Sequence, residues 1–162
     1  MKQNSAIRTA GLLRVLVYLA FAVNLLCLPC VPYLTMLALF FRENTPTAYW
    51  VLLVAFFWVC GGCTAVILWQ AKRILDTILA GNPFQAANAR SMNRAAVCCW
   101  VISGASAVRL AAELILFQTP LYLFGYNTVF IPCFFMAGLL FRVMGALFRQ
   151  ASELQEDQDL TI

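Results

Sequence analysis

The residues best suited to chemistry are the cysteines of two Cys-x-x-Cys motifs, Cys27 with Cys30 and Cys60 with Cys63. Two such pairs can hold a tetrahedral zinc ion or pass electrons between dithiols. If their segments form an antiparallel helical hairpin, a rise of about 1.5 Å per residue places all four thiols at one depth. The motifs therefore predict, as an alternative function, a membrane thiol oxidoreductase or a metal site.

The rest of the composition argues against this thiol chemistry. Apolar surroundings disfavour the reactive thiolate, and Cys98, Cys99 and Cys133 indicate that the chain uses cysteine as a small apolar residue. The sequence contains no histidine, which excludes histidine-based zinc, haem and general-base sites. It also lacks a glycine-rich phosphate loop and a Ser/His/Asp set. The leading interpretation is therefore a protein without enzymatic activity, cofactor or metal.

Arg109 and Glu113 are opposite charges, one helical turn apart, inside an otherwise apolar stretch. An ionised group in hydrocarbon costs at least about 2.5 kcal/mol, so such groups usually face other helices and pair. Arg42 and Glu43 stand at the end of an earlier apolar stretch and complete a predicted intramembrane polar cluster. Two interpretations stay open: a polar site for an extracytoplasmic ligand, peptide or proton, or a packing clasp that needs no ligand.

Composition indicates which elements must position these residues. The chain of 162 residues is 63% hydrophobic and 11% charged, which leaves too little polar surface for a soluble domain of this size. A helix needs about 20 apolar residues to cross roughly 30 Å of hydrocarbon. Four such runs cover about residues 15–41, 49–69, 95–117 and 121–147. The sequence predicts an all-α integral membrane four-helix bundle in the lipid bilayer, a single domain over 1–162.

The basic residues give this bundle an orientation. Of the 11 lysines and arginines, all but Arg42 and Arg109 lie at the same end of the apolar runs. They are Lys2, Arg8, Arg14, Lys72, Arg73, Arg90, Arg94, Arg142 and Arg149. The positive-inside rule then places both termini and the 71–94 loop in the cytoplasm, so the expected location is the plasma (inner) membrane. Because the net charge of +4 serves this orientation, no direct binding of nucleic acid is expected.

Prolines and glycines predict local features of the spans. Pro29 and Pro32 each remove a backbone hydrogen bond, which predicts a kink in the first span. Gly138 and Gly145 predict that the fourth span closely approaches a neighbouring helix, because small residues allow the backbones to come together.

The cytoplasmic parts are expected to extend the helices. Apolar residues at helical spacing continue past the second span and predict a helix that ends at Gly81. Residues 86–94 predict a short helix that leads directly into the third span. The last helix is expected to continue for two turns beyond Arg149, into an acidic cytoplasmic tail over 150–162.

Two motifs outside the spans carry a family resemblance. They are Gly81-Asn82-Pro83-Phe84 followed by Asn88-Ala89-Arg90 and Arg94, and the closing run from Glu153 to Ile162. With these motifs the chain resembles a widespread bacterial family of small four-span membrane proteins of unknown function, typified by the Bacillus YoaS protein. The resemblance implies no enzyme activity and a partnership with a very small Cro-like helix-turn-helix regulator. At Gln85 the chain departs from the family pattern, in which a hydroxyl or acidic helix cap is expected.

The resulting hypothesis is a sensor or accessory partner of a small cytoplasmic helix-turn-helix transcription regulator. Carboxylates of the tail would complement a basic DNA-binding protein, and its apolar end would dock in a groove or against a sheet edge. The predicted partner surface comprises Asn82, Phe84, Asn88, Arg90, Arg94, Glu153, Glu156, Asp157, Asp159, Leu160 and Ile162. In the other interpretation, the tail folds back on Arg90 and Arg94 or stays solvated.

Transport of a small solute, or peptide resistance, is a third candidate function. Four spans without an internal repeat are a poor scaffold for alternating access unless the protein forms a homo-oligomer. Homo-oligomers therefore belong to the partners that the sequence leaves open.

Overall fold

Four long α-helices make up nearly all of the described chain. The computed structural model describes residues 2–40, 47–80, 85–116 and 125–159. The helices are α1 (Lys2–Phe40), α2 (Thr47–Leu79), α3 (Ala86–Leu116) and α4 (Gly125–Asp159). The all-α prediction is confirmed over these ranges. Six residues of the predicted sites lie outside them: Arg42, Glu43, Asn82, Phe84, Leu160 and Ile162.

Each helix contains a segment that is long and apolar enough to cross a membrane, as predicted. These segments are Gly11–Leu34, Ala48–Leu79, Ala86–Ile115 and Thr128–Gln155. Large apolar side chains are exposed along all four helices, whereas polar side chains such as Ser103, Ser106 and Glu113 are buried. This distribution is the reverse of that in a soluble protein, and it suits an outer surface that is solvated by lipid.

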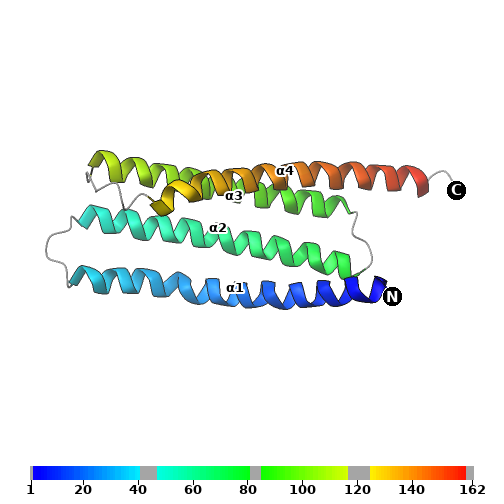
Figure 1. Ribbon diagram of the computed structural model, residues 1–162, viewed down its shortest axis with the longest axis horizontal. Coiled ribbons are helices and arrows are strands. Elements are labelled where there is room, and N and C mark those ends of the chain that lie inside the picture. Colours follow the sequence, from blue (N-terminus) through cyan, green and yellow to red (C-terminus); the bar gives the residue numbers. More distant parts are fainter. Residues whose placement is uncertain (1, 41–46, 81–84, 117–124, 160–162) are drawn as a thin grey trace.

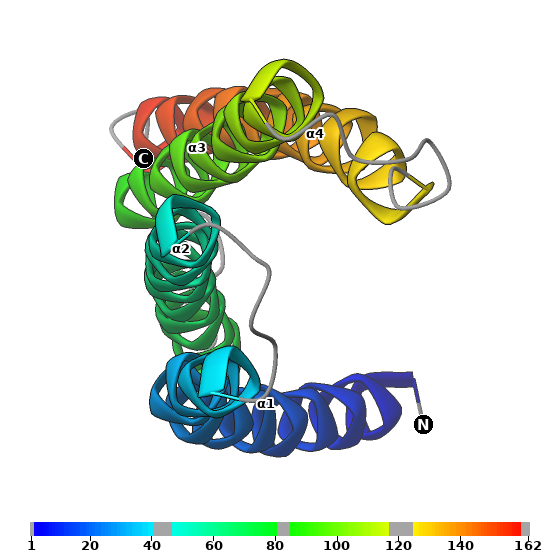
Figure 2. The ribbon, with the colours of Figure 1, turned by 90° about the vertical axis from the view of Figure 1, so that its left-hand side faces the viewer.

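The helices form an open arc in which each packs against its neighbours in sequence, α1 on α2, α2 on α3 and α3 on α4. Neighbouring helices are antiparallel, so the start of α1, the end of α2, the start of α3 and the end of α4 lie together (Figure 1). We call this the terminal end of the molecule. Viewed along the helices, the arc is a C with α1 and α4 at its tips (Figure 2). The four predicted helices are present, and α1 and α4 lie apart in this arc.

The core of the arc lies between α2, α3 and α4. At the terminal end, α2 contributes the buried side chains of Ile74 and Leu75. The buried apolar residues of α3 are Ala89, Ala95, Ala96, Cys99 and Ile102. None of the side chains described for α1 is buried, and its main contacts are with α2, so α1 is a peripheral helix.

Gly138 and Gly145 bring α4 close to α3, as their spacing predicts. A Cβ atom on Gly138 would overlap the indole ring of Trp100 and would lie 3.2 Å from the carbonyl oxygen of Ala96. On Gly145, it would lie 3.2 Å from the Oδ1 atom of Asn93. Such close packing is a main source of helix association in lipid, where the apolar solvent supplies little hydrophobic driving force.

At the terminal end α2 and α3 continue beyond the apolar runs, also as predicted. The last turn of α2 closes where the N–H group of Ala80 donates to the carbonyl oxygen of Asp76 at 3.0 Å. Gly81, where the helix was expected to end, lies outside the described residues. The helix predicted over 86–94 and the third span are a single uninterrupted helix, α3.

The two prolines of the first span lie within one continuous helix. Pro29 and Pro32 lie inside α1, and the helix continues through both of them to Phe40. Each proline removes one backbone donor, and the kink expected from this loss stays a prediction.

Candidate functional site

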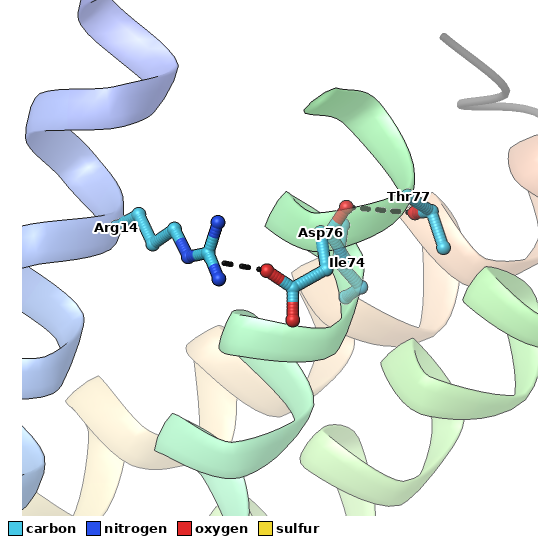
Figure 3. A network of polar contacts seen from close by, with 4 residues as sticks. All are labelled: Arg14, Ile74, Asp76 and Thr77. Carbon is cyan, nitrogen blue, oxygen red and sulfur yellow. Dashed lines mark hydrogen bonds and ion pairs between the residues drawn. The ribbon is translucent and has the colours of Figure 1, made fainter. Parts of the chain in front are cut away.

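A polar network ties three helices together at the terminal end. The Nε atom of Arg14 in α1 lies 3.3 Å from Oδ1 of Asp76 in α2, and both side chains are about half exposed (Figure 3). On the next residue of α2, the hydroxyl of Thr77 donates to the carbonyl oxygen of Ile74 at 2.7 Å (Figure 3). The amide of Asn88 in α3 donates to Oγ1 of Thr77 at 2.7 Å. The network thus fixes α1, α2 and α3 at one level.

Aromatic rings and cations reinforce the contact between α1 and α2. The Nζ atom of Lys72 lies 5.1 Å from the ring centroid of Tyr18 and 4.8 Å from that of Trp69. The guanidinium carbon of Arg14 lies 5.8 Å from the same Tyr18 ring centroid. Cation–π contacts of this kind contribute about 0.5–1 kcal/mol at exposed sites. Tyrosine, tryptophan and lysine at one level are typical of a membrane interface.

The structure divides the described part of the predicted partner surface. Arg90 and Arg94 on α3 are exposed, as are Glu153 and Asp157 on α4. Asn88, by contrast, is completely buried and bonded to Thr77. Asn88 is therefore removed from the partner surface, because a docking protein cannot reach its side chain without separating α2 from α3.

The acidic end of α4 continues the axis of the fourth span. The helix extends to Asp159 without interruption and projects past the ends of α2 and α3 (Figure 1). Glu153 accepts a hydrogen bond from Nε of Arg149 at 2.9 Å, one turn earlier on the same helix. The tail does not fold back on Arg94 over this range. Because α4 packs along α3, Glu153 and Arg90 nevertheless line the same pocket, which has a volume of about 410 Å³.

Arg109 and Glu113 form the predicted pair inside the membrane. Nε of Arg109 donates to Oε1 of Glu113 at 2.8 Å, and their side chains are 16% and 6% exposed. The Arg109 guanidinium also lies 4.8 Å from the ring centroid of Phe56, so the pair sits where α3 faces α2. Arg42 and Glu43, the other members of the predicted cluster, lie outside the described residues.

The four thiols of the Cys-x-x-Cys motifs do not converge. Cys27 and Cys60 line a pocket of about 220 Å³ between α1 and α2, and Cys30 is exposed. Cys63 instead interacts with Cys98 of α3. Within the described ranges, which include all four motif cysteines, no three cysteine or acidic side chains are grouped to hold a metal ion. The described residues therefore give no support to a four-thiol metal site, whereas the thiol oxidoreductase alternative stays a prediction.

Sequence reasoning missed the network of Arg14, Asp76 and Thr77. A signal was present: Arg14 precedes the first span and Asp76 follows the second, so a helical hairpin brings opposite charges to the same end. The Thr77 contact with Asn88 carries no comparable signal, since polar residues near a turn are usually solvated.

Length, apolar surface and buried polar groups place the chain in the class of multi-pass membrane proteins. Residues 38–162 match the family described as "Protein of unknown function (DUF2975)", and the chain belongs to this family. The match contains α2, α3 and α4 and only the end of α1, so it includes the whole packed core. No match is found among curated proteins or among solved structures. The link to a helix-turn-helix regulator stays a prediction.

Proposed function

We propose that the protein is a non-enzymatic accessory protein of the bacterial inner membrane that holds a small, basic helix-turn-helix regulator at the cytoplasmic face. The observation that carries the proposal is the end of α4. It is continuous with the fourth span, projects past the neighbouring helices and exposes Glu153 and Asp157 (Figure 1). A rigid helix with acidic side chains complements a basic protein and steers its approach.

The terminal end supplies a firm base for such a contact. Arg14, Asp76, Thr77 and Asn88 link α1, α2 and α3 at this end, and close packing at Gly145 attaches α4 to α3. A projecting helix on an ordered base loses little conformational entropy when a partner binds. The family resemblance of the loop and tail motifs implies the same kind of partner.

We propose further that the protein senses a ligand through the Arg109/Glu113 pair, near the opposite end of α3. A ligand that competes for either charge would change the contact of Arg109 with Phe56 and so the packing of α3 on α2. Because α3 also carries Asn88 and packs on α4, such a change has a direct structural route to the terminal end. This sensing role can be tested separately from the partner contact.

Copurification tests the partner contact. The full chain with an affinity tag at its N-terminus is produced together with the helix-turn-helix protein encoded by the adjacent reading frame. The neutralised variant is Glu156→Gln, Asp157→Asn and Asp159→Asn, and the matched control keeps the charge with Glu156→Asp, Asp157→Glu and Asp159→Glu. We expect about a tenfold loss of bound regulator in the neutralised variant, from three charges of roughly 0.5 kcal/mol each.

Salt and reporter output complete the test. Regulator binding to the wild-type chain and to the control should weaken as ionic strength rises, since surface charges are screened. A promoter controlled by the regulator should change its output in the neutralised variant and not in the control. Equal binding by all three proteins, or no binding to the wild-type chain, would contradict the proposed function.

A further inference from the structure

A polar pocket lies between α3 and α4 at the terminal end. Its volume is about 410 Å³, and its walls include the first turns of α3 at Ala86 and Ala89. Polar groups line the rest: Arg90, Asn93, Arg149, Ser152 and Glu153. Ser152 is only 6% exposed, so the pocket is lined by a buried polar residue as well as by charged ones.

The charges of the pocket favour an anion. Arg90 and Arg149 supply two guanidinium groups, while Glu153 supplies one carboxylate, so the sum is positive. Glu153 accepts a hydrogen bond from Nε of Arg149 at 2.9 Å. The two terminal nitrogens of that guanidinium are left to donate to another acceptor. Among the described residues, Arg90 forms no ion pair. Planar guanidinium groups match the oxygens of a phosphate, and the α3 N-terminus adds a favourable dipole.

The pocket also lies at the depth of the lipid headgroups. Arg90 is about 39 Å along α3 from Leu116, more than the roughly 30 Å of the hydrocarbon layer. Deeper in the same two helices, Val97, Val143 and Met144 are exposed and belong to the surface that lipid tails cover. A phosphate in the pocket would therefore be continuous with acyl chains along the helices.

We propose that the α3/α4 pocket binds the phosphate group of an anionic phospholipid. Arg90 and Arg149 hold the phosphate oxygens, and Asn93 and Ser152 donate further hydrogen bonds. The bound headgroup fastens the inner halves of α3 and α4 to each other. The site adjoins the proposed regulator contact, because Glu153 belongs to both. The copurification test leaves Glu153 unchanged, and Asp157, which it changes, does not line the pocket.

Lipid retention by the full chain tests the site. The protein is purified in detergent, mixed with equal amounts of phosphatidylglycerol and phosphatidylcholine, and examined by native mass spectrometry and thermal unfolding. The site variant is Arg90→Gln with Arg149→Gln, and the control is Arg94→Gln, an exposed arginine one turn along α3 that does not line the pocket. We expect the wild-type chain and the control to retain phosphatidylglycerol, and the site variant to retain about tenfold less.

Several outcomes would overturn the proposal. Equal retention of phosphatidylglycerol by the site variant and the control would remove the site, and equal retention of both lipids by the wild-type chain would remove its preference for an anion. A third arm uses inorganic phosphate: stabilisation equal to that by the lipid would overturn the lipid as the source of the phosphate. If the double variant is not folded, Arg90→Gln alone gives the same test, because Arg90 has no ion pair to lose among the described residues.

Discussion

Two arginine–glutamate pairs in this chain have the same geometry but differ in burial and therefore in their contribution to stability. Arg109 donates to Glu113 at 2.8 Å and Arg149 donates to Glu153 at 2.9 Å, in both cases across one helical turn. The side chains of the first pair are 16% and 6% exposed, whereas those of the second are 76% and 59% exposed. A buried charge that loses its partner has no water to replace it, so the first pair is costly to break and the second is not.

Neutralising one carboxylate in each pair measures this difference. Glu113→Gln leaves the Arg109 charge without its counter-ion and should lower the free energy of unfolding by about 3–5 kcal/mol. The matched change Glu153→Gln should alter it by less than about 0.5 kcal/mol. Unfolding in mixed micelles, followed by circular dichroism, gives both values.

A further variant distinguishes a clasp from a ligand site. Replacing both charges, Arg109→Met with Glu113→Leu, should recover much of the loss if the pair serves packing, because no buried charge remains. Equal effects of Glu113→Gln and Glu153→Gln would show that the membrane pair is as well solvated as the surface pair.

At the scale of elements, the rotation of a helix about its own axis decides which neighbouring helix a side chain faces. The depth of a residue along the helix does not decide this. Helical rise predicts all four motif thiols at one depth, yet Cys27 and Cys60 line one pocket, whereas Cys63 interacts with Cys98 of α3. Hydrophobic patterning gives little help with rotation in a membrane, because lipid-facing and core-facing positions are both apolar. Gly138 and Gly145 are informative because their lack of a side chain marks the face that meets α3.

Alanine at Gly138 tests this packing. Its Cβ atom would overlap the Trp100 indole ring, so Gly138→Ala should destabilise the protein by about 1–3 kcal/mol. Gly104→Ala is the control, since nothing lies within 4 Å of a Cβ at that position. The control should be neutral or stabilising by up to about 1 kcal/mol, because alanine favours a helix over glycine. Equal stability of the two variants, measured by thermal unfolding in detergent, would contradict close α3–α4 packing at Gly138.

At the scale of the whole molecule, the open arc separates a packed part from a peripheral one. Helices α2, α3 and α4 contain every buried side chain of the described residues, whereas α1 has its main contacts with α2. At the terminal end, Arg14, Tyr18, Lys72 and Asp76 contribute to the contact between α1 and α2. Because neighbouring helices are antiparallel, the start of α1 and the end of α4 lie at the same end of the molecule (Figure 1).

Reporter fusions test which side that is. Green fluorescent protein fused after Ile162 should fluoresce in a bacterial host, and alkaline phosphatase fused there should be inactive, because the positive-inside rule predicts that the basic terminal end stays in the cytoplasm. Alkaline phosphatase fused after residue 119, past three spans, should be active. The reverse pattern of activities would contradict the orientation.

The sequence by itself determined the all-α class, the four spans and the extension of α2, α3 and α4 beyond the apolar runs. It also determined the Arg109/Glu113 pair. These features follow from local composition and helical repeat, which need only the residues of one segment. The open arc, the burial of Asn88, the dispersed cysteines and the α3/α4 pocket were decided by the tertiary structure. They depend on how each helix is rotated against its neighbour, and in an apolar solvent that rotation is set by the fit of side chains across helices.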